Sequence, residues 1–279
     1  MKIFDTHCHY NLEPLYSGKS KYFSPQQMRQ LKNLTWKDHW QKAQQSGVSA
    51  SLVAAADVIS SQRAVKIAQE ENSLYASVGI HPSNANKNSQ ALKNDFDVIT
   101  KLASKKEVVG IGETGLDYFH LSKPNLKRKI VAQKELFIKH INLANTLEKP
   151  LIIHSRDKGD QAYDDLLKII RANYQFKKPL VLHCVSGTVT HLKKMLKLNA
   201  YVSFAGNITY TSGNLHNLIK LVPQDKLLIE TDAPFLPPQE FIGQINQPYM
   251  ITKTAQYIQD KFNKNLKQIL ANSYKFFEI

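Results

Sequence analysis

Cysteine and long apolar runs are both scarce in this sequence. Its two cysteines, Cys8 and Cys184, are too few for a disulfide framework, and we expect buried thiols in a reducing cytosol. The longest apolar stretch, residues 51–59, carries Asp57 and is too short to cross a bilayer. The N-terminal residues lack the basic start and apolar core of a signal peptide. The sequence therefore predicts a cytoplasmic protein with no membrane partner.

Acidic residues are outnumbered by basic ones, 23 to 37, which gives a net charge of +14. A basic excess attracts polyanions such as nucleic acids. The lysines, however, are spread over most of the predicted helices, and no stripe of cations with interleaved aromatics stands out. The charge is therefore compatible with a nucleic-acid substrate without requiring one.

Short apolar runs alternate with longer amphipathic segments along the whole chain. The runs are rich in Val, Ile, Leu and Ala and nearly continuous in hydrophobicity, as in strands that are buried on both faces of a parallel sheet. They cover residues 2–9, 49–56, 74–81, 108–113, 150–155, 179–184, 200–206 and 226–232. The segments between them have helical spacing, most clearly residues 124–147.

Eight strand-and-helix units in one chain predict an α/β fold, a single-domain TIM-type (β/α)8 barrel over residues 1–279. A doubly wound open sheet is the alternative, but no glycine-rich dinucleotide fingerprint follows the first run. The long polar connection at residues 10–33 would border the mouth of a barrel, because the loops after the strands form that rim.

Residues that commonly bind metals end most of these runs. His7 and His9 are two positions apart, so on a strand their side chains share one face. The full set consists of His7, His9, His81, Glu113, His154, His183 and Asp232. In a barrel, all of these side chains meet at the C-terminal mouth, where such enzymes place their chemistry.

The chemical types in this set predict a metal site. We take His7, His9, His154, His183, Glu113 and Asp232 as the ligands. Imidazoles and carboxylates together suit zinc and similar divalent ions. Six ligands are too many for one open catalytic zinc but fit two ions about 3.5–4 Å apart, and Glu113 is placed in the sequence to bridge them. The expected cofactor is thus a pair of divalent ions, with Zn, Mg and Mn as candidates.

The ordered motifs resemble the TatD family of metal-dependent hydrolases, among the amidohydrolase-like barrels, nearly from end to end. The resemblance rests on residues 5–9 (Asp-Thr-His-Cys-His), 79–82 (Gly-Ile-His-Pro), 112–118 (Gly-Glu-Thr-Gly-Leu-Asp-Tyr), 150–156 (Pro-Leu-Ile-Ile-His-Ser-Arg), 183–187 (His-Cys-Val-Ser-Gly) and 230–236 (Glu-Thr-Asp-Ala-Pro-Phe-Leu). It implies a binuclear divalent-metal centre and deoxyribonuclease activity, often exonucleolytic.

The resemblance also implies roles for individual residues. His7 and His9 would hold one ion, completed by Asp232, and His154 and His183 would hold the other. Glu113 would bridge the ions, and His81 and Arg156 match positions near the substrate phosphate.

The favoured hypothesis is hydrolysis of a phosphodiester in DNA, at single strands or ends, as a 3′–5′ exonuclease. A metal-activated water would be the nucleophile, and Asp232 would orient it and accept its proton. Arg156 would stabilise charge on the phosphoryl oxygens with its planar fork, while His81 would donate to a substrate oxygen. RNA as substrate and endonucleolytic cleavage are also compatible with the sequence.

Two alternatives keep the barrel but change the function. Related barrels hydrolyse small amides, lactones or esters, and an aminoacyl ester of tRNA is another possible substrate. Many of those enzymes bridge their metals with a modified lysine where this chain has Glu113, which argues against them. A non-catalytic nucleic-acid-binding barrel is the second alternative, and the intact ligand set argues against it.

One segment departs from the family pattern. The family typically shows Arg-Gly-Lys, one further residue and Asn-Glu-Pro late in the chain, whereas residues 242–248 here read Ile-Gly-Gln-Ile-Asn-Gln-Pro. Two positive charges and one negative charge are replaced, so we expect an altered affinity or substrate choice if this segment borders the site.

Overall fold

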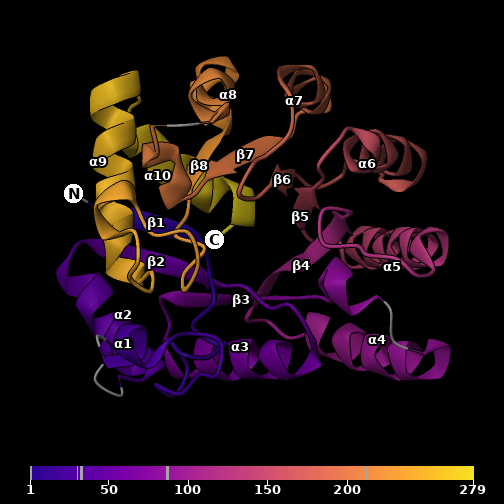
Figure 1. Cartoon of the computed structure of the whole chain (residues 1–279), viewed down its shortest axis with the longest axis horizontal. Coiled ribbons are helices and arrows are strands. Elements are labelled where there is room, and N and C mark those ends of the chain that lie inside the picture. The colour runs from indigo at the N-terminus through magenta and orange to yellow at the C-terminus, as the bar shows by residue number, and fades with distance from the viewer. Residues whose placement is uncertain (1, 30, 32–33, 86–87, 212) are drawn as a thin grey trace.

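The computed structural model describes residues 2–279 except for residues 30, 32–33, 86–87 and 212. Its centre is one sheet of eight parallel strands in chain order, curved into a barrel with helices around it (Figure 1). The strands are β1 (Ile3–Cys8), β2 (Val48–Val53), β3 (Leu74–Val78), β4 (Val108–Asp117), β5 (Leu151–Arg156), β6 (Leu180–Leu182), β7 (Tyr201–Phe204) and β8 (Leu227–Ile229). The Thr6 hydroxyl donates to the Ile229 carbonyl over 2.9 Å, which ties β8 back to β1.

Helices follow the strands and form the outer layer of the molecule (Figure 1). The connecting helices are α2 (Trp36–Gln45), α3 (Val58–Glu70), α4 (Ser89–Ala103), α5 (Leu126–Leu147), α6 (Gln161–Asn173), α7 (Val189–Leu196) and α8 (Leu215–Leu221). The short α1 (Pro25–Arg29) precedes α2, and α9 (Ile251–Phe262) and α10 (Leu266–Phe277) follow β8. No helix in the described part of the chain has the length and apolar character that a bilayer crossing needs.

The prediction of a TIM-type barrel is confirmed, and each predicted apolar run overlaps one strand. The fourth run was predicted to end at Glu113, and this boundary is wrong. β4 continues to Asp117, because residues 114–117 stay paired with residues 153–156 of β5. The helix predicted over residues 124–147 is α5, which begins two residues later, at Leu126.

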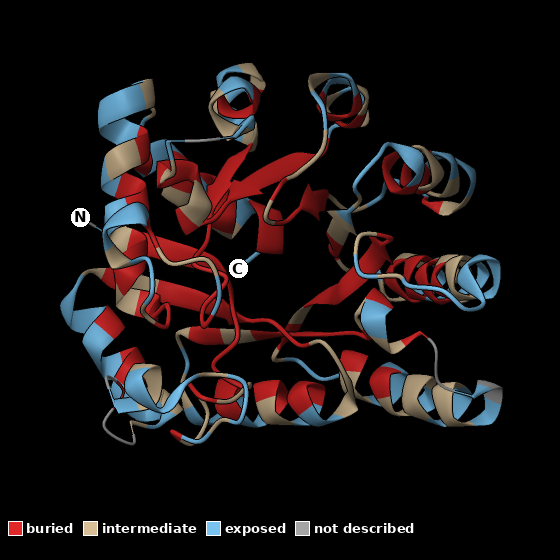
Figure 2. Ribbon diagram, viewed as in Figure 1, coloured by how far each residue is buried: buried red, intermediate tan, exposed pale blue. Residues whose placement is uncertain are grey.

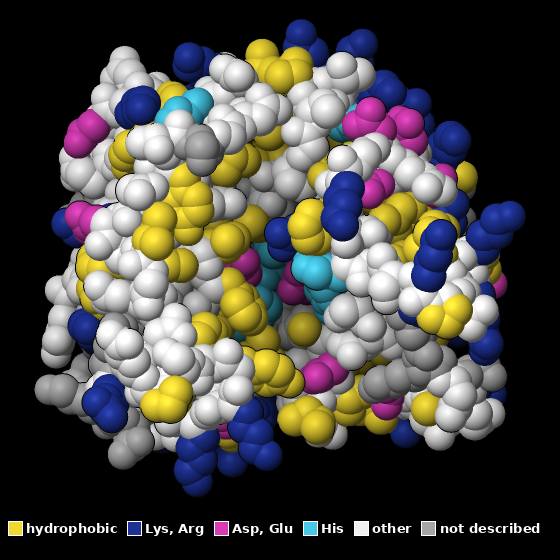
Figure 3. Space-filling model, in the orientation of Figure 1, with side chains coloured by type: hydrophobic (Ala, Val, Ile, Leu, Met, Phe, Trp, Pro, Cys, Tyr) yellow, Lys and Arg dark blue, Asp and Glu magenta, His cyan; other side chains and the backbone are white. Residues whose placement is uncertain are grey.

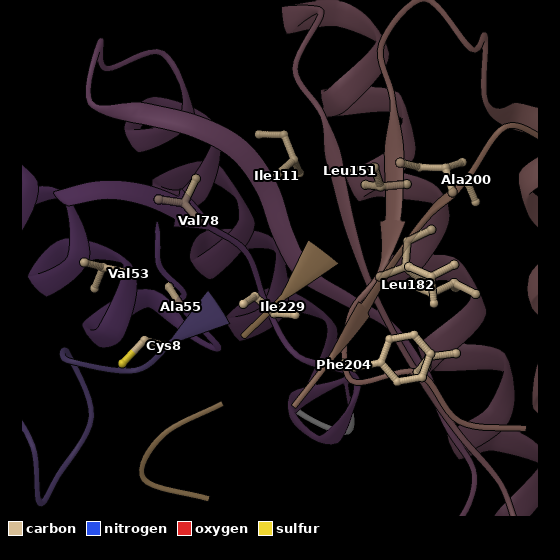
Figure 4. Close-up of a cluster of buried hydrophobic side chains, with 14 of the residues drawn as sticks. Cys8, Val53, Ala55, Val78, Ile111, Leu151, Leu182, Ala200, Phe204 and Ile229 are labelled. Carbon is tan, nitrogen blue, oxygen red and sulfur yellow. The ribbon is translucent and has the colours of Figure 1, made fainter. Parts of the chain in front are cut away.

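The strands are buried on both faces, which explains their continuous hydrophobicity (Figure 2). On the helix side, every strand contributes to one apolar layer. The contributing side chains that Figure 4 labels are Cys8, Val53, Val78, Ile111, Leu151, Leu182, Phe204 and Ile229. A second cluster contains Phe4, Leu52 and Leu228 from the strands together with Phe276 and Phe277 of α10. The last helix therefore packs against the barrel interior at the level of Phe4. The polar residues lie beyond this apolar layer, toward the C-terminal ends of the strands.

Candidate metal centre

The six predicted ligands come from five different strands or the residues just after them. His7 lies in β1, Glu113 in β4 and His154 in β5, while His9, His183 and Asp232 follow β1, β6 and β8. All except His7 line one cavity of about 950 Å³, and His7 is fully buried beneath it. Figure 3 shows histidine and acidic side chains at the bottom of this opening. The structure thus brings together residues that lie more than two hundred positions apart.

Glu113 lies at the centre of the cluster, and its two carboxylate oxygens face different groups of imidazoles. Glu113 Oε1 is 2.9 Å from His183 Nε2 and 3.0 Å from His154 Nδ1. Glu113 Oε2 is 3.6 Å from His7 Nε2 and 3.9 Å from His9 Nε2. A carboxylate that offers one oxygen to each of two imidazole pairs has the arrangement of a bridging ligand.

Asp232 joins the His7 and His9 side of the cluster. Its Oδ1 is 3.3 Å from His9 Nε2 and 3.9 Å from His7 Nε2. The backbone holds it there, because the Asp232 amide donates to the His7 carbonyl over 2.8 Å and the His9 amide donates to the Ala233 carbonyl over 2.8 Å. These bonds between the ends of β1 and β8 fix the carboxylate beside the two imidazoles.

The residues fit a metal centre. Neither ring nitrogen of His7 has a hydrogen-bond partner among the described residues, although the side chain is fully buried. An unpaired buried imidazole is costly unless it binds an ion. The ligand atoms of His7, His9 and Glu113 lie within 4.8 Å of one another, and so do those of Glu113, His154 and His183. Mixed nitrogen and oxygen donors of this kind suit zinc, manganese and similar ions.

The electrostatics of the cluster also favour a cation. Burial opposes ionisation of Glu113, but the imidazoles around it, His183 first, hold the pKa of its carboxyl well below the ordinary value. Burial and the neighbouring His183 lower the pKa of His7, so its ring stays neutral and keeps a free lone pair. Burial opposes charge on His183, yet Glu113 and Glu230 raise the pKa of this imidazole well above its ordinary value. A bound cation would therefore displace a proton from His183.

Two side chains that support the ligands were not predicted as site residues. Glu230 Oε1 accepts a hydrogen bond from the Cys184 amide over 2.6 Å and lies 3.3 Å from His183 Nδ1. Asp117 Oδ2 lies 3.1 Å from His154 Nε2 and 2.8 Å from His120 Nδ1, and so orients His154 on the side away from Glu113. Glu230 and Asp117 belong to the same sequence motifs as Asp232 and Glu113. Their closeness to these ligands in the sequence was the only signal that could have identified them as supporting residues.

Glycine is required where β4 lies close to β5 on one side and to the residue after β3 on the other. Gly112 has φ +137°, and a Cβ there would lie 2.4 Å from the Ile152 carbonyl oxygen. A Cβ on Gly79 would lie 2.7 Å from the Gly112 backbone. Only glycines allow this contact, which places Glu113 immediately beyond it.

His81 and Arg156, the predicted phosphate-binding residues, both line the cavity. His81 Nε2 is 3.5 Å from Glu113 Oε1, and its Nδ1 accepts a hydrogen bond from the Ser83 amide over 3.2 Å. Burial lowers the pKa of His81 to about 4, so the ring is neutral and carries its proton on Nε2. The exposed Arg156 guanidinium lies 4.4 Å from the centre of the Phe119 ring. Among the described residues, it forms no ion pair with Asp157 or Asp160, the local partners that the sequence offers.

The rest of the mouth is largely apolar. Leu12 and Phe23 of the 10–33 connection line it, which confirms for these residues that the connection borders the mouth; its positions 30 and 32–33 lie outside the described residues. Phe235 and Leu236 line it after β8, and hydrophobic side chains surround much of the opening in Figure 3. The altered 242–248 segment reaches the mouth through Gln244.

The barrel and its candidate metal centre define a metal-dependent hydrolase. The family model described as TatD related DNase matches residues 4–278. The chain is 30% identical to the uncharacterized metal-dependent hydrolase YabD of Bacillus subtilis, with 99% of each chain covered. It is 32% identical to the uncharacterized metal-dependent hydrolase BU355 of Buchnera aphidicola, with 92% of this chain and 90% of the relative covered. The crystal structure of the TatD homologue YJJV of Escherichia coli superimposes with a TM-score of 0.80 at 25% identity, over 99% of this chain and 98% of that one. The chain belongs to the TatD family.

Proposed function

We propose that the protein is a deoxyribonuclease that hydrolyses phosphodiesters at a binuclear metal centre, as a 3′–5′ exonuclease on DNA strands. The observation that carries this proposal is Glu113, whose two oxygens face two separate imidazole pairs at the bottom of an open mouth. Two divalent ions held by these residues would supply Lewis-acid chemistry and make a coordinated water more acidic, which suits displacement at phosphorus.

The distances support the ligand roles that the family resemblance implies. His7 and His9 would hold one ion together with Asp232, and His154 and His183 would hold the other. Asp232 lies at the cavity surface on the first side, where its carboxylate can orient a water and accept its proton. Burial of Asp232 is outweighed by His9 and the other imidazoles, which keep its pKa low, so the group is ionised and ready to accept.

Arg156 and His81 would hold the substrate phosphate on the opposite side. The Arg156 guanidinium offers a planar fork of donors that matches two phosphoryl oxygens, and Phe119 supports it from behind. His81 presents an N–H from Nε2 toward the same space. These donors would act on a non-bridging or leaving oxygen where negative charge develops.

The apolar wall around Leu12, Phe23 and Phe235 is a specific observation in favour of a second candidate, a small ester or amide substrate. A lactone and an aryl ester should therefore be assayed beside DNA with the same metals. Efficient hydrolysis of these compounds without cleavage of DNA would overturn the nuclease proposal.

The test uses 5′-labelled single-stranded DNA with added Mn²⁺, Mg²⁺ or Zn²⁺. We expect products that shorten from the 3′ end, and losses of at least about a thousandfold in Glu113→Ala and Asp232→Ala, because metal and nucleophile are lost together. Glu107→Ala is the control, since Glu107 precedes the same strand as Glu113 at the far end of the barrel. Full activity in either site variant would remove the proposed roles.

A further inference from the structure

Two cations outside the metal cluster lie over one aromatic ring at the rim of the mouth. The Arg156 guanidinium is 4.4 Å and the Lys158 ammonium 5.2 Å from the centre of the Phe119 ring. Phe119 follows β4, Arg156 is the last residue of β5, and Lys158 lies in the connection after β5. Because Arg156 also lines the cavity, this cluster carries positive charge from the metal centre onto the outer surface.

The first turn of α5 extends this positive surface. It contains Lys127 and Arg128, both exposed, and no acidic residue. Cations at the start of a helix oppose the helix dipole and destabilise the fold, so this local arrangement works against stability. Within the described part of the chain, neither residue forms an ion pair. Lys129 Nζ donates to the Ser122 carbonyl over 2.8 Å, which holds this turn against the loop that follows Phe119.

The two sides of the mouth therefore differ in chemistry. The side formed after β8 and by the 10–33 connection presents Leu12, Phe23 and Phe235, while the side formed after β4 and β5 presents the cations. In Figure 3, hydrophobic side chains dominate to the left of the opening, and Lys and Arg side chains lie to its right, on the side of α5 and α6 in Figure 1.

We propose that Phe119, Arg156, Lys158, Lys127 and Arg128 form a binding surface, the β4–α5 cationic surface, for the part of a single-stranded nucleic acid that leads away from the scissile phosphate. The inference rests on the proposed function and adds the path of the strand. A polyanion follows positive charge, and the apolar side provides none along Leu12, Phe23 and Phe235. Phe119 is a positioning residue that holds two of the cations in place.

The expected size of the effect follows from counterion release. For single strands, the logarithm of the binding constant falls with the logarithm of salt concentration by about 0.7 per phosphate contact. Removing the contacts of Lys127 and Arg128 should therefore flatten the slope by about 1.4. At 0.1 M salt this corresponds to binding about 25-fold weaker.

The experiment compares Lys127→Ala/Arg128→Ala with Lys105→Ala/Lys106→Ala in the Mn²⁺-loaded protein. The control pair removes the same charge from exposed residues between α4 and β4, at the far end of the barrel. Binding of a fluorescent phosphorothioate 12-mer, which resists hydrolysis, is followed by anisotropy at several salt concentrations. We expect the loss and the flatter slope in the first variant alone, and unchanged kcat/KM in both for a dinucleotide with one phosphate.

Equal losses in both variants, or none in the first, would overturn the inference. Lys127→Glu/Arg128→Glu guards against a folding defect, because acids suit the helix start; we expect its Tm to rise by roughly 2–4 °C while 12-mer binding is lost. Binding of the 12-mer at this surface without any DNA cleavage would refute the proposed nuclease function and leave the surface standing. DNA cleavage together with 12-mer binding that is unaffected by Lys127→Ala/Arg128→Ala would refute the binding surface and leave the proposed nuclease function standing.

Discussion

Glu230→Gln offers the sharpest test of how the proposed second ion would be held. Glu230 is fully buried, and its Oε1 accepts a 2.6 Å hydrogen bond from the Cys184 amide and lies 3.3 Å from His183 Nδ1. Glutamine keeps the shape and one acceptor oxygen but removes the charge. The carboxylate raises the basicity of His183, so its loss should weaken the bond from His183 to an ion.

The expected magnitude is moderate and confined to one ion. Loss of a carboxylate behind a ligating histidine typically lowers metal affinity by about 10–100-fold, or about 1.4–2.7 kcal/mol. This agrees with the roughly twofold advantage of a charged over a neutral acceptor in hydrogen bonds. His7 and His9 do not contact Glu230, so the ion on their side should keep its affinity.

Calorimetric titration of the metal-free protein with Zn²⁺, in the presence of a competing chelator, separates the two binding events. We expect wild type to bind two ions and Glu230→Gln to show the loss in one event only. Glu135→Gln, which neutralises an exposed acid on α5, is the control. Equal weakening of both events, or unchanged affinity in a variant with a normal circular dichroism spectrum, would refute the proposed role of Glu230.

Three further outcomes are expected. His140 donates from Nδ1 to the Leu136 carbonyl and accepts at Nε2 from the Ile80 amide, and burial lowers its pKa to about 4 from the usual 6.5. The unfolded chain binds the extra proton, so this stabilisation is full above pH 6.5 and about 3 kcal/mol of it is lost as the pH falls toward 4. Urea unfolding of the metal-free protein should show this decline, and it should be smaller in His140→Gln, because His81 still contributes. Phe276→Ala removes a fully buried ring whose centre lies 5.1 Å from that of Tyr201, and it should lower the free energy of unfolding by about 3–5 kcal/mol in the same assay. A change of only a few tenths of a kcal/mol would contradict the burial of this ring. Arg156→Lys should lower kcat/KM for DNA by about tenfold or more without altering metal content by elemental analysis, because a point charge replaces a planar fork; a loss of bound metal would place Arg156 in the metal centre instead.

The barrel was predictable because every strand is buried on both faces and therefore appears as a short continuous apolar run. The convergence of His7, Glu113 and Asp232 followed from the same assignment, since parallel strands in a barrel end at one mouth. The end of β4 was not predictable in this way. The glycines around Glu113 resemble a strand terminus, while the pairing of residues 114–117 with β5 is a tertiary contact.

The supporting residues escaped prediction for a related reason. Glu230 precedes Asp232 by two positions, but it acts on His183, and that contact depends on how β8 lies relative to the end of β6. Asp117 supports His154 only because β4 is longer than the apolar pattern implies. Sequence spacing identifies which residue types reach a strand end, whereas the partner of each carboxylate is set by the neighbouring strands.

Among the described residues, the mouth carries its positive charge on one side only: the altered 242–248 segment is neutral, whereas the β4–α5 cationic surface is positive. Asn246 remains buried and donates to the Thr231 and Phe235 carbonyls over 2.8 Å and 2.6 Å, so the segment still supports the backbone around Asp232. The segment reaches the mouth through the neutral Gln244, at the position where the family typically shows a lysine. Positive charge is instead concentrated beyond Arg156, on the far side of the metal centre. On the proposed function, a nucleic-acid strand thus has one favourable direction in which to leave the site, and Gln244→Lys should add a second.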